Sequence, residues 1–126
     1  MLSIKRCSGN PLLGPNSELP WGGCEARNPG VIFDGEKFRM IFTASPKPRN
    51  GEIYLGYAES RDGVRFECAP EPFLSPCPDE DAFDHASVED ARVTELEGKY
   101  YIAYINQRYI RDTETSEWND CGYSYW

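Results

Sequence analysis

The sequence predicts an all-β protein built of β-propeller blades. The first observation is an internal repeat, in which Asn28–Phe42 aligns without a gap on Asp90–Tyr104. Each copy has a polar residue, a short apolar run, a glycine-containing turn with a lysine, and an alternating aromatic and aliphatic run. The second is composition, because ten prolines, eleven glycines and 13% aromatic residues suit frequent turns and half-buried sheets. Short strands that recur in this way are typical of propellers, and 126 residues would form about one and a half to two blades.

The first blade is expected at about residues 28–68. Its second strand is the clearest, because Phe38, Met40 and Phe42 alternate with residues of the opposite face. Residues 8–30, which are rich in glycine, proline and asparagine, are predicted to form a loop. The blade's four antiparallel strands are predicted at Val31–Phe33, Lys37–Ala44, Glu52–Glu59 and Val64–Glu67, the last two joined by a tight turn at Arg61-Asp62-Gly63.

The second blade is expected at about residues 88–126 and to be incomplete. Its strands are predicted at Val88–Glu95 and Tyr100–Asn106, and the polar residues 108–120 are predicted to form a loop. Cys121–Trp126 resembles the start of the first blade's third strand, which Gly51–Leu55 opens. An unfinished blade leaves a strand edge and an apolar face uncovered. We therefore expect a homo-oligomer, or the remainder of a longer chain, to cover these surfaces.

Charge and hydropathy limit the classes of partner. Thirteen basic and twenty-one acidic residues give a net charge of −8, which disfavours nucleic acid and anionic membranes as partners. Neutral ligands such as sugars are compatible with this charge. The first residues lack the apolar core of a signal peptide, and no apolar run is long enough to span a bilayer, so we expect a cytoplasmic protein.

Metal sites and disulfides have little support. The cysteines are odd in number and have no CxxC spacing, which predicts reduced, structural thiols. They are Cys7, Cys24, Cys68, Cys77 and Cys121. The acidic connection from Pro70 to Ala86 is interpreted as a solvated loop and not as a metal site, because loops that bind hard cations need tighter ligand spacing and a glycine at the bend.

The sharpest candidate for chemistry is Glu89-Asp90, at the start of a strand expected to line the propeller's central channel. The repeat places Asn28 at the same point of the preceding blade, so two short polar side chains would face one channel, as a sugar site requires. The alternative is that Asp90 caps a turn or pairs with Arg92. Arg92 itself has two open interpretations, a group that orients the carboxylate or binds an anion, and a plain ion pair.

Other polar and aromatic residues are interpreted more simply. His85 is the only histidine, and no serine or cysteine lies in a recognisable nucleophile motif, so a loop role is favoured over a catalytic triad. Three aromatic residues are interpreted as packing groups in preference to sugar-stacking platforms: Trp21, Tyr100 and Tyr101. A loop expected at the channel mouth carries Lys47, Arg49 and Asn50, for which solvated charge is the commoner explanation.

These stretches together resemble glycoside hydrolase family 130, the inverting β-mannoside phosphorylases and related β-mannosidases, which are five-bladed β-propellers. The resemblance covers about residues 8–106, and its motifs occur in the family's order. They are Asn10-Pro11-Leu12-Leu13 with Pro15 and Trp21, Arg27-Asn28-Pro29-Gly30-Val31, Gly56–Phe66, Glu89-Asp90-Ala91-Arg92-Val93-Thr94 and Gly98–Tyr104.

The resemblance implies a role for several residues. Asp90 falls on the general acid of the family's Asp-Pro-Arg motif, and a sugar-contacting role is implied for Asn28, with Arg92 also positioning substrate. Ala91 departs from the usual proline. Ile41-Phe42-Thr43-Ala44 stands where many members have Tyr-Arg-Ala, so an arginine that faces sugar or phosphate is absent unless Arg49 substitutes for it.

The implied reaction is inverting cleavage of a β-mannoside in an oligosaccharide. In similar proteins the aspartate is thought to protonate the leaving oxygen through a sugar hydroxyl, and inorganic phosphate is the possible co-substrate, with no other cofactor and no metal. A hydrolase would instead need a second carboxylate to activate water. The competing hypothesis is a non-catalytic truncated propeller fragment or carbohydrate-binding module that keeps the blade fold without a working site.

Overall fold

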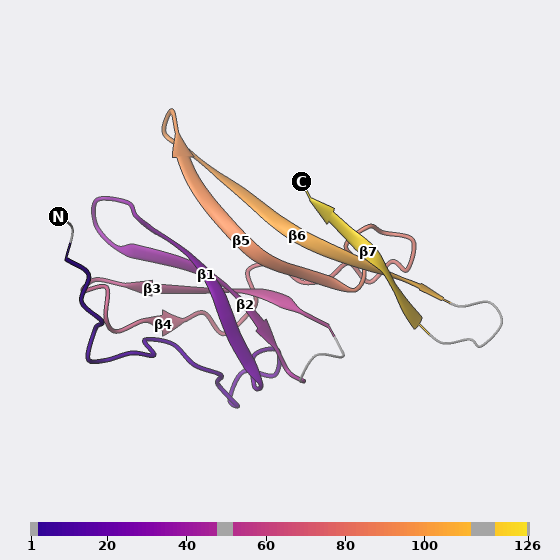
Figure 1. Ribbon diagram of the computed structural model, residues 1–126, viewed down its shortest axis with the longest axis horizontal. Helices are drawn as coiled ribbons and strands as arrows, with labels where there is room; N and C mark the ends of the chain where they lie inside the picture. Colours follow the sequence, from indigo (N-terminus) through magenta and orange to yellow (C-terminus); the bar gives the residue numbers. More distant parts are fainter. Residues whose placement is uncertain (1–2, 48–51, 112–117, 126) are drawn as a thin grey trace.

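The computed structural model describes residues 3–47, 52–111 and 118–125, with side chains for 3–47 and 52–106. The described residues form seven strands in two antiparallel sheets, and no helix occurs among them (Figure 1). The prediction of an all-β fold is confirmed. It follows that these residues contain no helix long and apolar enough to cross a membrane.

The first sheet has the strand order β1-β2-β3-β4. Its strands are β1 (Glu25–Phe33), β2 (Phe38–Ser45), β3 (Tyr54–Ser60) and β4 (Glu67–Cys68). The prediction that the last strand begins at Val64 is wrong. Asp62 Oδ1 accepts hydrogen bonds from the main-chain N–H groups of Val64 and Arg65, each at 2.8 Å, and this holds both residues in the turn.

Strand β1 also begins earlier than predicted, because Glu25–Gly30 belongs to the strand and not to a loop. Arg27 pairs with Thr43 and Gly30 pairs with Ile41, so Asn28 and Pro29 together lie opposite the single residue Phe42 and form a β-bulge. Proline has no N–H to donate and is tolerated at a bulge. A polar, proline-containing sequence that reads as a loop is therefore an irregular part of a strand.

The second sheet has the order β5-β6-β7. Its strands are β5 (Ser87–Leu96), β6 (Lys99–Arg111) and β7 (Trp118–Tyr125). Residues 108–111 and 118–120 lie in strands, so the predicted loop at 108–120 is wrong there. Ile105 pairs with Tyr125 as Thr43 pairs with Leu55, so β7 occupies the place in the second sheet that β3 has in the first.

The internal repeat is also a repeat of strand register. In both copies the first strand bulges at the same point, between Arg27 and Gly30 and between Glu89 and Arg92. The pairs after the bulge correspond one to one: Gly30↔Ile41 with Arg92↔Ala103, Val31↔Met40 with Val93↔Ile102, and Phe33↔Phe38 with Glu95↔Tyr100. The sequence repeat is thus a structural unit.

Strand β2 is buried on both faces. On one face Trp21, Met40 and Phe42 form a cluster with Ala44 and Ala58. On the other face the residues that join the two sheets are Ile41, Leu55, Val88 and Ala91. Strand β5 contacts β1, β2 and β3 and crosses the first sheet, as Figure 1 shows. Residues 62 positions apart in the sequence therefore meet at the seam between the sheets.

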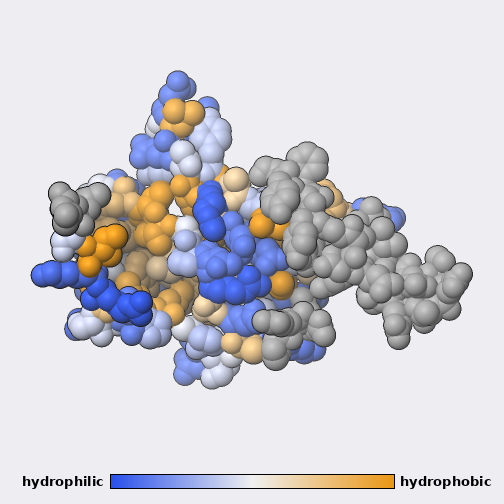
Figure 2. All heavy atoms as spheres, in the orientation of Figure 1, coloured by the Kyte–Doolittle hydropathy of each residue, from blue (hydrophilic) through white to orange (hydrophobic). Residues whose placement is uncertain are grey.

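The β5–β6 hairpin tip projects from the body and is exposed. Leu96, Tyr100 and Tyr101 keep 58%, 47% and 53% of their surface accessible. In Figure 2 the tip stands at the top of the view and carries both apolar and hydrophilic residues. Tyr100 and Tyr101 were expected to pack, and the described part of the chain leaves them exposed.

Candidate functional site

Asp90 sits in the bulge of β5 with a left-handed backbone, at φ 56°. Asparagine and aspartate adopt this conformation more readily than other residues with a Cβ atom. The N–H group of Asp90 points across the seam and donates to Thr43 Oγ1 at 2.8 Å. The bulge thereby turns the Asp90 side chain towards the first sheet.

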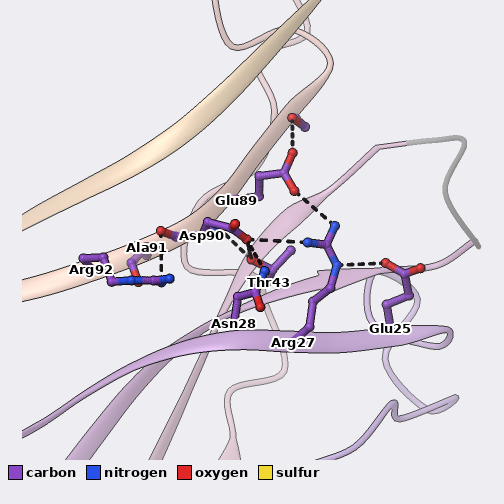
Figure 3. Close-up of polar contacts among 9 residues, drawn as sticks. Glu25, Arg27, Asn28, Thr43, Glu89, Asp90, Ala91 and Arg92 are labelled. Carbon is purple, nitrogen blue, oxygen red and sulfur yellow. Dashed lines mark hydrogen bonds and ion pairs between the residues drawn. The ribbon is translucent and has the colours of Figure 1, made fainter. Parts of the chain in front are cut away.

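Asn28 sits in the equivalent bulge of β1 and is also left-handed, at φ 50°. Its Nδ2 donates to Asp90 Oδ1 at 2.7 Å. Figure 3 shows the two side chains lying against each other. The side chain of Asp90 is 24% exposed, and Asn28 is exposed. The structure therefore brings together the two residues that the repeat placed at one point, and solvent reaches them.

The contacts of the Asp90 carboxylate converge on one of its oxygens. Besides Asn28, Thr43 Oγ1 lies 3.2 Å from Oδ1 and Arg27 Nη1 lies 3.5 Å from it. Among the residues that the structure describes, none bonds to Oδ2. Asp90 thus has one oxygen held by three donors and one oxygen available to another group.

Arg27 is the residue that the sequence analysis missed. Its Nη2 donates to Glu89 Oε2 at 3.0 Å and its Nε to Glu25 Oε2 at 3.1 Å. Burial lowers the pKa of Arg27, but hydrogen bonds and charges from Glu25 and Glu89 outweigh it, so the pKa is raised. A signal was present in the sequence, because the repeat aligns Arg27 on Glu89, and opposite charges at equivalent positions of adjacent sheets can meet.

Glu89 is held in a structural position. Only 6% of the residue is exposed, and Ser87 Oγ donates to Oε1 at 3.2 Å while Arg27 bonds to Oε2. A buried carboxylate needs such partners. Of the pair Glu89-Asp90, therefore, only Asp90 has an oxygen without a bonded partner in the described structure.

Arg92 does not bond to the carboxylate of Asp90. Its Nη1 donates to the main-chain oxygens of Ala91 and Asp90, at 3.0 and 3.3 Å. The interpretation that Asp90 and Arg92 form an ion pair is therefore wrong. Arg49, the other proposed substrate-binding residue, lies outside the described residues.

The remaining candidates have structural partners. His85 Nδ1 lies 3.2 Å from the main-chain oxygen of Cys77. Trp21 is buried, donates from Nε1 to Pro70 O at 2.9 Å and lies against Phe42, with ring centroids 6.2 Å apart. Trp21 is thus a packing residue, as predicted. The four cysteines with described side chains, Cys7, Cys24, Cys68 and Cys77, are free.

The local charge decides what this site can bind. Three carboxylates, from Glu25, Glu89 and Asp90, surround the single guanidinium of Arg27. An anion at this point would need further cations, whereas a neutral sugar would need only hydrogen-bonding groups. The arrangement offers such groups in Asn28 and Asp90.

Comparison with known proteins gives consistent matches. The model of the family described as beta-1,4-mannooligosaccharide phosphorylase matches residues 10–119. Two curated relatives come from Thermoanaerobacter sp. (strain X514). A 1,2-beta-oligomannan phosphorylase is 32% identical over 109 residues, which cover 82% of this chain and 36% of the relative. A beta-1,2-mannobiose phosphorylase is 33% identical over 115 residues, covering 82% and 37%. The chain therefore spans little more than a third of the curated relatives that it matches.

Solved structures show the same fold. One is assigned to the family 130 of mannoside phosphorylases, described as containing glycoside hydrolases that target β-1,2 mannosidic linkages in Candida mannan. It has a TM-score of 0.67 at 24% identity, with 91% of this chain and 39% of that chain covered. A glycosyl hydrolase from Bacteroides ovatus has a TM-score of 0.59 at 19% identity, covering 94% and 39%. The two sheets described above are thus blades of the five-bladed propeller fold.

Proposed function

Because the chain belongs to glycoside hydrolase family 130, the β-1,4-mannooligosaccharide phosphorylase family, we propose that its protein cleaves β-mannosidic bonds with inversion and uses Asp90 as general acid. The observation that carries this proposal is the pairing of Asn28 with Asp90 at 2.7 Å, partly open to solvent and formed by equivalent bulges of adjacent blades. In such a position both side chains can form hydrogen bonds with a sugar, and the carboxyl group of Asp90 can exchange a proton with it.

The proposed step begins with a protonated Asp90. The proton passes to the leaving glycosidic oxygen, directly or through a hydroxyl of the sugar, while phosphate or water attacks the anomeric carbon from the opposite face. The bond between the anomeric carbon and the leaving oxygen breaks, and its electron pair stays on that oxygen. Asp90 is left as a carboxylate, whose Oδ1 accepts from Asn28, Thr43 and Arg27.

Glu89 is a poor candidate for the base that a hydrolase needs. A base must reach the attacking water, but both oxygens of Glu89 are already bonded, to Arg27 and Ser87, and the residue is buried. The described residues therefore supply the acid side of the reaction. Phosphate, if it is the acceptor, would be held by cations other than Arg27, whose charge is shared by three carboxylates.

The substrate class is a β-linked mannooligosaccharide. The family model carries a β-1,4 description, while both curated relatives are phosphorylases named for β-1,2-linked mannosides. We propose that one of these two linkages is cleaved. A neutral oligosaccharide also agrees with the negative charge of the site and of the whole chain, −8.

The test is an assay of the intact protein on β-1,2- and β-1,4-mannobiose, with and without inorganic phosphate. Release of mannose 1-phosphate identifies a phosphorylase, and an α-anomeric product, read by NMR, identifies inversion. Asp90→Asn should lower turnover about a hundredfold to ten-thousandfold, as loss of a general acid does. The matched control is Glu95→Gln, an exposed residue of the same strand, which should leave turnover unchanged. No turnover of either disaccharide at any phosphate concentration would refute the proposal.

The second candidate is a carbohydrate-binding module without catalysis. It is favoured by one observation, that the described site contains no second group free to activate an acceptor, since Glu89 is fully bonded and Arg92 is turned onto main-chain oxygens. Calorimetry with the two mannobioses separates the candidates. Binding without turnover supports the module, and turnover that Asp90→Asn abolishes excludes it.

A further inference from the structure

Thr43 lies in the interior of β2, directly opposite Arg27 of β1, and none of its surface is accessible. Its hydroxyl is at the seam between the blades and makes two contacts with Asp90. It accepts from the N–H of Asp90 at 2.8 Å and lies at 3.2 Å from Oδ1 of the same residue. A hydroxyl has one proton to donate and lone pairs to accept, so it can make both bonds at once.

These two hydrogen bonds constrain different parts of Asp90. The bond from the N–H holds the main chain of Asp90 in its left-handed conformation, at φ 56°. The bond to Oδ1 fixes the rotation of the carboxyl group. The buried hydroxyl of Thr43, from the neighbouring blade, therefore fixes both the main-chain conformation of Asp90 and the orientation of its carboxyl group.

The carboxyl group of an acid carries its proton on one oxygen. Donors placed on Oδ1 by Asn28, Thr43 and Arg27 favour negative charge on that oxygen and disfavour a proton there. Oδ2 has no bonded partner among the described residues. The proton of the neutral acid then resides on Oδ2, which is free to donate it.

We propose that Thr43 is a positioning residue that reserves Oδ2 of Asp90 for proton transfer, by holding the main chain and Oδ1 from across the blade seam. This rests on the proposed role of Asp90 as general acid. Thr43 does not contact substrate in this proposal. It acts through Asp90 alone.

The experiment compares Thr43→Val with Thr43→Ser in the intact protein. Valine keeps the shape of the buried side chain and removes the hydroxyl, whereas serine keeps the hydroxyl. On the mannobiose that the protein cleaves, Thr43→Val should lower kcat by about tenfold or more, the effect of one lost hydrogen bond to a charged group, and leave KM within about twofold. Thr43→Ser should restore kcat to within about threefold of the unaltered protein.

A second measurement does not depend on activity. Amide hydrogen exchange at Asp90 should be protected in the unaltered protein and in Thr43→Ser, and at least about tenfold faster in Thr43→Val. An unprotected Asp90 amide in the unaltered protein overturns the proposal even if Thr43→Val does not fold. Equal kcat in the valine and serine variants overturns it as well. If the protein has no turnover on any mannoside while Asp90 stays protected through Thr43, the proposed function fails and the positioning contact stands.

Discussion

The side-chain amide of Asn28 donates to the carboxylate of Asp90 at 2.7 Å, across 62 positions of sequence. Each residue occupies a bulge in the first strand of its blade, and each has a left-handed backbone, at φ 50° and 56°. The two bulges therefore have the same structural role, one in each blade. Each turns a short polar side chain out of the strand and towards the other.

The first prediction concerns the backbone of Asn28. Asn28→Gly and Asn28→Ala both remove the amide that bonds to Asp90, but only alanine has a Cβ atom that the left-handed conformation disfavours. Asn28→Ala should therefore be less stable than Asn28→Gly, by about 1 kcal/mol in free energy of unfolding. Urea denaturation of both variants measures this difference. If the two variants are equally stable, the bulge is not left-handed in solution.

The second prediction concerns the contact of the blades at Gly30. A Cβ atom added here would lie 2.7 Å from the main-chain oxygen of Ala91, the residue after Asp90. Because the obstacle is backbone, Gly30→Ala should destabilise the protein by about 2 kcal/mol and move Asp90 away from Asn28. Gly14→Ala is the matched control, because nothing lies within 4 Å of an added Cβ there, and its effect should stay within about 0.5 kcal/mol.

The measurement for Gly30 is thermal or urea unfolding, together with turnover of mannobiose. Turnover should fall in Gly30→Ala even where the variant is fully folded, since Asp90, the proposed general acid, is displaced. Equal stability of the Gly30 and Gly14 variants would show that the two blades do not approach as closely as the structure places them.

The third prediction concerns the ion pair between Arg27 and Glu89, which spans 3.0 Å. Arg27→Gln leaves the nearly buried Glu89 with a hydroxyl as its remaining partner, so it should cost about 2 kcal/mol of stability. Glu89→Gln alone should cost less, because it removes the buried charge. A double-mutant cycle of these two changes should give a coupling free energy of about 1–2 kcal/mol. Additive effects would show that the pair does not form in solution.

Much of the fold could be predicted from the sequence because the repeat is regular. Phe38, Met40 and Phe42 alternate in β2 with the period of a strand, and the register of the repeat carried over residue for residue. The predicted strand boundaries are wrong where a bulge or a hydrogen-bonded turn interrupts the alternation of apolar and polar residues. Asn28-Pro29 reads as a loop but is a bulge, and Asp62 draws Val64 into its turn.

Only part of the candidate site, the pairing of Asn28 with Asp90, could be predicted from the sequence. Equivalent positions in the repeat placed Asn28 beside Asp90, since a repeat fixes which residues share a position. The partners that come from across the seam, Arg27 and Thr43, depend on how one blade packs on the next. The sequence carries no signal of this packing for Thr43, whereas for Arg27 it carries one, because the repeat aligns Arg27 on Glu89. Arg92, the nearest cation along the chain, does not bond to the Asp90 carboxylate, and its contact with substrate stays a prediction.

The fourth prediction concerns acid stability at the turn of Asp62. Main-chain N–H groups of Arg65 and Val64, and then the Ser60 hydroxyl, lower the pKa of Asp62 from 3.8 to about 2. A depressed pKa in the folded state means that this carboxylate stabilises the fold fully above its unfolded pKa of about 4, and that the contribution is lost as the pH falls towards 2.

Asp62→Asn cannot ionise, so the stability difference between the unaltered protein and this variant should be constant from pH 7 to 5 and shrink between about pH 4 and 2. Urea denaturation of both proteins across this range measures the difference, in which the titration of all other groups cancels. A difference that stays constant down to pH 2 would show that Asp62 does not hold its turn as a carboxylate.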